Sequence, residues 1–84
     1  MKVTEETYLK EHGCRLGNPD DFDPCSFRSM ERDHDGKQYR AIMAKRPGED
    51  TMTEQSYQYP KDEWKENEAR KHCEDHGGKL FEPA

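Results

Sequence analysis

Residues 57–84 read YQYPKDEWKENEARKHCEDHGGKLFEPA, and this stretch decides the fold that the sequence predicts. It contains the only tryptophan of the chain, Trp64. Pro60 precedes a run that is compatible with a helix, and a Gly-Gly pair at 77–78 follows it. Proline is typical of the start of a helix and glycine of its end. The signals agree on one helix, which begins between residues 61 and 66.

The side chains of this helix predict how it packs. Those at near-helical spacing on one face are Trp64, Ala69, His72, Cys73 and His76. Acidic residues near the start favour the positive end of the helix dipole, and these are Asp62, Glu63, Glu66 and Glu68. We expect Trp64 to be a core anchor rather than a binding residue.

Upstream segments favour an antiparallel sheet. Residues 25–32 alternate weakly, and Asp35-Gly36 supplies the positive φ angles of a hairpin turn. Residues 38–45 are apolar on both faces around their middle, which is typical of a central strand. Residues 51–59 are rich in threonine and tyrosine and should pair antiparallel with that strand.

The remaining segments complete an α+β domain. We expect residues 12–17 to be extended, Phe22 to anchor a turn, and residues 80–81 to form a short final strand or a tail that packs back. The predicted fold is a small antiparallel sheet of about three strands with one C-terminal helix packed on it. Residues 1–11 are predicted to be a flexible or weakly helical tail, and residues 12–84 a single small domain.

Composition predicts a shallow core. Of the 84 residues, 29% are hydrophobic and 39% charged, and the mean hydropathy is −1.50. A chain of this size is near the limit at which one core suffices. We therefore expect support from a partner chain, a metal or a larger parent protein.

Charge and cysteine count limit the function classes. The net charge of −5 and the absence of a basic run argue against direct nucleic-acid binding. No segment predicts a membrane span or a signal peptide, so we expect an intracellular protein that is not secreted. Three cysteines is an odd number, which argues against a fully paired disulfide framework and favours reduced thiols.

Two blocks of the sequence resemble blocks in tailed-bacteriophage morphogenesis proteins. The first contains Glu11, His12, Cys14, Arg15, Leu16, Pro19 and Phe22. The second contains Tyr59, Pro60, Lys61, Trp64, Glu68, Ala69, His72, Cys73, His76, Gly77, Gly78, Phe81, Glu82, Pro83 and Ala84. Proteins with this pattern accompany phage prohead (maturation) serine proteases and capsid-assembly proteins. The resemblance implies a phage origin, an accessory role, and a location in the host cytoplasm or the virion.

The chain departs from this pattern at the start of the helix. The family has threonine where this chain has Lys65, which cannot accept the backbone hydrogen bond of a capping box. We therefore expect the helix start to move upstream, to a cap at Asp62. The serines Ser26, Ser29 and Ser56 do not lie in a nucleophile-elbow setting, so protease activity is not expected.

A zinc site is the alternative that the histidines and cysteines leave open. His72 and His76 are four residues apart, so both rings can face one ion, with Cys73 beside them and His12 or Cys14 arriving from the N-terminal block. Zinc-finger spacings are absent. We favour the interpretation that Cys14 and Cys73 are small buried residues that join the N-terminal block to the helix. The zinc site is the second choice, and a Cys14–Cys73 disulfide is the third. No cofactor is expected.

Two further surfaces are candidates for binding. Tyr39, Tyr57 and Tyr59 could form an exposed aromatic row for a peptide or a base, although with so few aliphatic residues we favour their burial in the core. Asp35, at the predicted hairpin tip, is the fourth candidate binding residue. A hard-metal nuclease site built on Glu31, Asp33, His34 and Asp35 is a weaker alternative.

These observations predict a non-enzymatic protein-interaction module linked to capsid assembly or prohead maturation. Its partner would be a phage assembly protein, and its working surface the exposed sheet face or the hairpin at residues 33–36. A small phage inhibitor of a host defence or nucleic-acid enzyme, acting by protein binding or acidic mimicry, is the alternative. A zinc-binding module is the second alternative.

Overall fold

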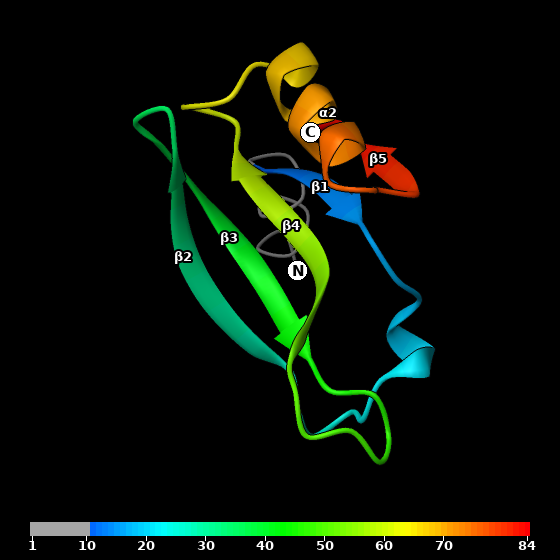
Figure 1. The fold of residues 1–84 in the computed structure, drawn as a ribbon. Coiled ribbons are helices and arrows are strands. Elements are labelled where there is room, and N and C mark those ends of the chain that lie inside the picture. The colour runs from blue at the N-terminus through cyan, green and yellow to red at the C-terminus, as the bar shows by residue number, and fades with distance from the viewer. Residues whose placement is uncertain (1–10) are drawn as a thin grey trace, which may run out of the picture.

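The computed structural model describes residues 11–84 as a five-stranded antiparallel sheet with one α-helix packed on it (Figure 1). The elements in chain order are β1 (Glu11–Arg15), the 3-10 turn η1 (Pro19–Asp21), β2 (Arg28–His34), β3 (Lys37–Ala44), β4 (Thr53–Pro60), α2 (Glu66–Asp75) and β5 (Leu80–Glu82). The strand order is β2-β3-β4-β1-β5. The tail predicted for residues 1–11 lies outside the described residues, apart from Glu11, the first residue of β1.

The α+β class is confirmed, but the prediction of about three strands is wrong. The two extra strands, β1 and β5, have five and three residues. Neither has an alternating apolar pattern of its own, and each becomes a strand only by pairing with a segment distant in sequence. Because β1 and β5 extend one side of the sheet, β4 is the middle strand and not residues 38–45.

The β2–β3 hairpin forms where the sequence predicts it. Asp35 and Gly36 have φ angles of 53° and 80°, and His34 pairs with Lys37. Only part of residues 25–32 is strand, as expected, and β2 begins at Arg28. Asp23 is the reason, because its side chain accepts a hydrogen bond from the Cys25 backbone N–H at 3.0 Å and holds residues 23–26 in a turn.

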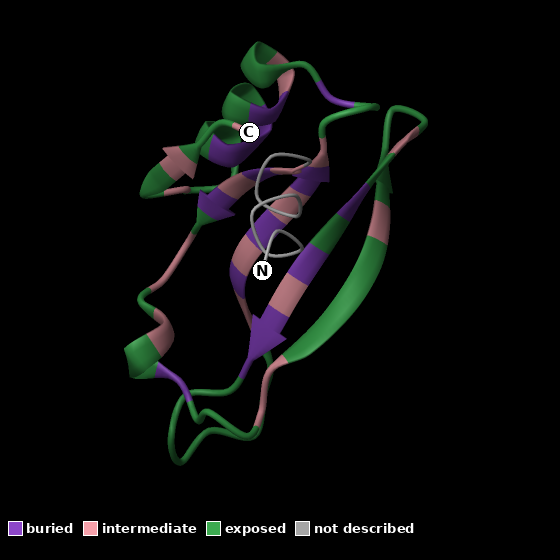
Figure 2. Cartoon of the chain, turned by 180° about the vertical axis from the view of Figure 1, so that it is seen from behind, coloured by how far each residue is buried: buried purple, intermediate pink, exposed green. Residues whose placement is uncertain are grey.

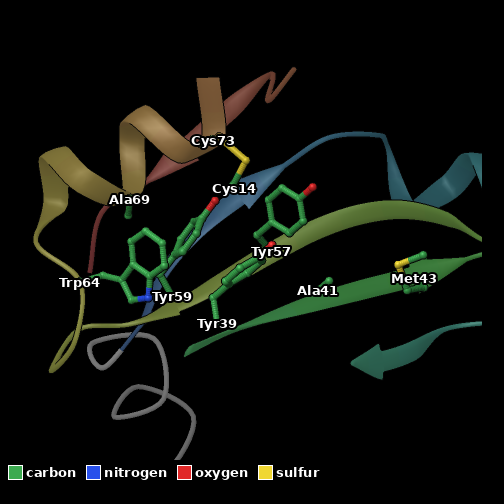
Figure 3. Packing of buried hydrophobic residues seen from close by; sticks show 9 residues of the cluster. All are labelled: Cys14, Tyr39, Ala41, Met43, Tyr57, Tyr59, Trp64, Ala69 and Cys73. Carbon is green, nitrogen blue, oxygen red and sulfur yellow. A yellow bond between two sulfur atoms is a disulfide. The ribbon is translucent and has the colours of Figure 1, made fainter. Parts of the chain in front are cut away.

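The helix covers one face of the sheet, here called the inner face, and the core lies between them (Figure 2). Alternate residues of β3 and β4 are buried on this face. The buried cluster consists of Cys14, Tyr39, Ala41, Met43, Tyr57, Tyr59, Trp64, Ala69 and Cys73 (Figure 3). Phe22 is also buried, as predicted, under the 3-10 turn and beside Arg46.

The segment between β4 and α2 is attached to β3 by side chains. The last β3–β4 pair toward this segment is Arg40↔Gln58, and Pro60 has no N–H with which to extend the ladder. The Glu63 carboxylate accepts the Gln38 N–H at 3.0 Å, and the Trp64 indole N–H donates to the Gln38 carbonyl at 2.9 Å. Trp64 is therefore buried before the helix begins.

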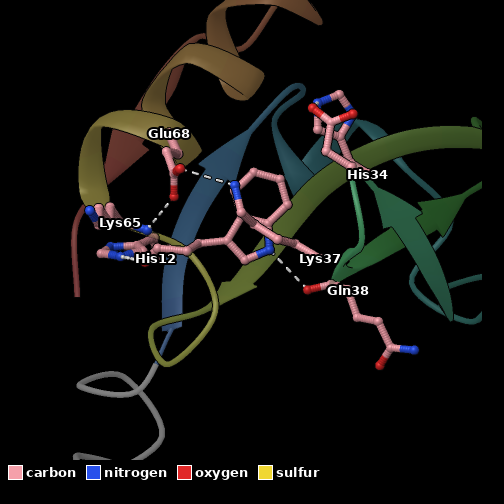
Figure 4. Close-up of polar contacts among 8 residues, drawn as sticks. His12, His34, Lys37, Gln38, Lys65 and Glu68 are labelled. Carbon is pink, nitrogen blue, oxygen red and sulfur yellow. Dashed lines mark hydrogen bonds and ion pairs between the residues drawn. The ribbon is translucent and has the colours of Figure 1, made fainter.

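The expected Asp62 cap is wrong. Lys65 is the N-cap, and its backbone N–H donates to the Glu68 carboxylate at 3.0 Å (Figure 4). Glu68 also pairs with Lys37 at 3.0 Å. One half of a capping box thus suffices, because the Glu68 side chain supplies it and the Lys37 pair holds that side chain in place.

A Cys14–Cys73 disulfide joins β1 to α2 and corrects the prediction of reduced, unpaired thiols. The Cα atoms are 5.6 Å apart, within the range that a disulfide bridges. Cys25 is exposed and unpaired, which accounts for the odd number of cysteines. The pairing depends on β1 lying beside β4 under the helix, and no local sequence signal encodes that placement.

The disulfide should contribute strongly to stability. It closes a loop with a sequence separation of 59, for which chain-entropy arguments give about 4 kcal/mol. We expect the Cys14→Ser/Cys73→Ser double variant to lose roughly that amount in urea unfolding, whereas Cys25→Ser stays unchanged. In the native protein only Cys25 should react with a thiol reagent. Reaction of three thiols without prior reduction would contradict the pairing.

Gly78 is required by its contact with the disulfide. A Cβ at this position would overlap Cys73 Sγ and lie 2.7 Å from both Cys14 Sγ and the Cys73 carbonyl oxygen. We expect Gly78→Ala to destabilise the protein by about 1–3 kcal/mol in urea unfolding, as overpacked cores do. Gly13→Ala is the matched control, because its Cβ would have no neighbour closer than 3.7 Å. Equal stability of the two variants would show that the chain relaxes around residue 78.

Candidate functional site

Three of the four histidines lie together where α2 meets the end of β2, and of these only His72 is buried, whereas His34 and His76 are exposed. His72 is 4% exposed and lies at the centre of this histidine cluster, which consists of His34, His72 and His76. The ring of His76 stacks on that of His72 with centroids 4.0 Å apart, and the ring of His34 meets it edge-on at 5.0 Å. His34 is the last residue of β2, so the hairpin and the helix both contribute to the cluster.

The His72 ring is held by one hydrogen bond and by aromatic faces. Its Nδ1 lies 2.7 Å from the Tyr59 hydroxyl. Burial raises the pKa of Tyr59, so this hydroxyl keeps its proton. Which of the two groups donates is set by the tautomer of the His72 ring. The buried Nε2 of this ring has no hydrogen-bond partner within residues 11–84, and the rings of Tyr39 and His34 meet His72 at steep angles.

The cluster keeps His72 uncharged. The pKa of His72 falls to about 4, mainly because the ring is buried and in smaller part because His76 and His34 lie beside it. A charged imidazolium at this position would lack the water that stabilises it and would face two other histidines. The ring serves as a core residue at neutral pH.

His12 is separate from the histidine cluster. Its Nε2 donates to the Trp64 carbonyl at 3.2 Å, and its Nδ1 accepts from the Ala84 N–H at 2.9 Å. Its ring also stacks on Phe81. Both nitrogens are therefore occupied in holding the segments before α2 and after β5 against β1.

The structure does not assemble the zinc site that the sequence leaves open. Cys14 and Cys73 bond to each other, so neither is a thiolate. His72 and His76 share a helix face as predicted, but their rings stack in near-parallel planes and do not converge on one point. Within residues 11–84 no group of three histidine, cysteine or acidic side chains is arranged to hold a metal ion.

The favoured interpretation of the three tyrosines as core residues is confirmed, and the alternative of an exposed aromatic row is wrong. Tyr39, Tyr57 and Tyr59 are 8%, 1% and 0% exposed. The Tyr57 hydroxyl bonds to the Glu54 carboxylate, which together with burial raises the pKa of Tyr57. The helix covers these rings because every second residue of β3 and β4 faces it.

The hairpin acids do not form a nuclease site. Glu31 and Asp33 share one face of the sheet, and the His34 side chain lies on the other face. Asp35 is at the tip, with a side chain that is 84% exposed and 3.5 Å from His34 Nε2. It remains available as a surface residue.

The face opposite α2, here called the outer face, carries polar side chains. Arg40 on β3 donates to Glu11 at 3.3 Å and to Gln58 at 3.1 Å, which links three strands. A shallow hollow surrounds this group, lined by Glu11, Glu31, Gln38, Tyr39, Arg40, Gln58, Pro60 and Glu63. The sequence does not single out Arg40, and only its alternation with Tyr39 and Ala41 indicates its orientation.

No family model, curated protein or solved structure matches this chain. The phage resemblance therefore stays a prediction. In residues 11–84 the structure has no helix long and apolar enough to cross a membrane.

The depressed pKa of His72 predicts loss of stability in acid. Between the unfolded value near 6.5 and the folded value of about 4, the unfolded chain binds more protons than the native one. Stability from this group is thus fully present above about pH 6.5 and falls as the pH drops to about 4. The loss should be on the order of 3 kcal/mol, measured by urea unfolding across that range.

A non-titrating control isolates the contribution of His72. His72→Gln should be less stable at neutral pH but should lose the part of the pH dependence that this ring causes. NMR titration of the native protein gives the ring pKa directly. A His72 pKa at or above 6.5 would contradict the burial of a neutral ring.

Proposed function

We propose that this protein is a non-enzymatic protein-interaction module that serves capsid assembly or prohead maturation in a tailed phage. The observation that carries the proposal is the one-sided sheet, because among residues 11–84 the only α-helix packs on the inner face. The outer face carries the Arg40–Glu11 ion pair and the hydrogen bond from Arg40 to Gln58. A sheet face with exposed polar and charged side chains can form the hydrogen bonds that are common in protein–protein interfaces.

Several residues of the types that often carry catalysis lie in the core. These are His72, Tyr39, Tyr57, Tyr59 and the bonded pair Cys14 and Cys73, whereas His34, His76 and Cys25 are exposed. The burial of the first group supports a binding role over turnover, because a buried ring or a disulfide does not present a reactive atom to a substrate. Asp35 and the hairpin tip would lie at the margin of the binding surface.

The disulfide favours the virion over the host cytoplasm as the working location. Disulfides persist on virion surfaces, whereas cytosolic thiols are kept reduced. The phage partner would be a scaffold, capsid or protease subunit, and direct contact with nucleic acid or with a membrane is not part of the proposal.

Capture from a reconstituted assembly mixture tests this function. The scaffold, capsid and protease proteins of the phage that encodes this chain are co-expressed with it, and we expect one of them to co-purify. Arg40→Glu should weaken capture by about tenfold, because it places a third acid beside Glu11 and Glu31. Lys79→Glu makes the same charge change at an exposed position between α2 and β5 and should have no effect.

Two outcomes would contradict the proposal. One is failure to capture any assembly protein, and the other is equal capture by the Arg40→Glu and wild-type proteins. Tight, salt-sensitive binding to a host enzyme instead would support the inhibitor alternative.

A further inference from the structure

Strand β2 is an open edge of the sheet. Within residues 11–84 it pairs with β3 alone, over its whole length from Arg28↔Met43 to His34↔Lys37. It has seven residues, contains no proline, and its register with β3 is regular. Long edges without a proline or a bulge are templates for a further strand.

The backbone groups that face this edge follow from the hydrogen bonds of Gln38. Its N–H and C=O are engaged by Glu63 and Trp64, on the side away from β2. Gln38 and Asp33 are therefore a pair that exchanges no backbone hydrogen bonds. Asp33, and every second residue before it, namely Glu31 and Ser29, must turn their N–H and C=O groups outward to the open edge.

The side chains along this edge separate by charge. Arg28, Met30 and Arg32 lie on the inner face, and Ser29, Glu31 and Asp33 on the outer face. Most of this strand is exposed, and Met30 retains 48% of its surface.

Several of these charges have no ion-pair partner among residues 11–84. Arg28 donates to the Phe27 carbonyl, and Arg32 shares the Glu54 carboxylate at 3.3 Å. Neither Glu31 nor Asp33 forms an ion pair in the part of the chain that the structure describes. The edge thus presents a basic inner row and an acidic outer row.

A second copy of this chain is a poor occupant of the edge. Two-fold antiparallel pairing in one continuous sheet must oppose residues of the same face. Centred on Glu31 it places Glu31 against Glu31, and centred on Met30 it places Arg28 against Arg32. Like charges directly opposite each other destabilise a strand pair.

We propose that β2 docks an extended segment of the partner protein as an additional strand of the sheet. The segment would place acidic side chains opposite Arg28 and Arg32 and basic side chains opposite Glu31 and Asp33. Backbone hydrogen bonds to the open edge would supply affinity, and the alternating charges would select the segment. This inference rests on the proposed function and names the class of partner that the module recognises.

Synthetic peptides test the inference without any phage protein. In antiparallel register, the heptapeptide EKEKVTE places glutamates opposite the basic row and lysines opposite the acidic row. We expect it to bind about tenfold more tightly than the charge-reversed KEKEVTK, measured by NMR titration of the isotope-labelled protein. Added salt should weaken the binding. The amides of Ser29, Glu31 and Asp33 should become protected from hydrogen exchange.

A matched pair of variants separates backbone pairing from charge. Glu31→Pro removes an N–H that faces the open edge, so it leaves the β2–β3 ladder intact and should abolish peptide binding. Glu31→Gln keeps that N–H and should retain weaker binding. The amide spectrum of each variant checks that the fold is preserved.

Three results would overturn the inference. They are equal affinity for the two peptides, absence of protection along β2, and unchanged binding by the Glu31→Pro variant with its fold intact. A concentration-dependent dimer that Glu31→Pro abolishes would assign the edge to self-pairing instead. None of these results bears on the capture of assembly proteins through the outer face, so the two proposals fail separately.

Discussion

The packing of α2 on the aromatic rings of β3 and β4 is the interaction on which the rest of the structure depends. Four aromatic residues, Tyr39, Tyr57, Tyr59 and Trp64, belong to the buried cluster of a chain that is only 29% hydrophobic. Large rings bury much area per residue, so a few of them can form a core that aliphatic side chains are too scarce to build. The helix has to lie over them, and that requirement defines the inner face.

Two features make this thin core sufficient. The Cys14–Cys73 disulfide restricts the unfolded chain and fixes β1 beneath the helix. The Gln38 contacts with Glu63 and Trp64 hold the loop before α2 against β3, so the indole is buried at the position where the helix starts. Small domains often need such cross-links, because their core alone stabilises them by only a few kcal/mol.

The same packing directs function to the surface. His72 in another setting would be a candidate acid, base or ligand, but here its ring fills the core and stays neutral. Backbone edges and charged faces remain accessible, as do the rings of His34 and His76. The outer face around Arg40 and the open edge of β2 are both of this kind, and both suit recognition of another protein.

The sequence by itself predicted the elements that depend on residues close together in the chain. The Asp35-Gly36 turn, the two strands that flank the residue 45–52 loop, the helix and its glycine end, and the burial of Phe22 and Trp64 all follow from turn chemistry, periodicity and side-chain size. The candidate site was predicted less well. Tyr39, Tyr57 and Tyr59 were correctly predicted to be core residues. The histidines and cysteines of the zinc alternative do not form a metal site within residues 11–84.

Only the tertiary structure decided the strand order, the disulfide and the histidine cluster. β1 and β5 are too short to carry a pattern, and their pairing joins segments more than half the chain apart, such as Cys14 and Phe81. Cys14 lies against Cys73, and His34 against His72, because the helix packs on one face of the sheet. Contacts of this kind depend on the global packing free energy, which no short stretch of sequence contains.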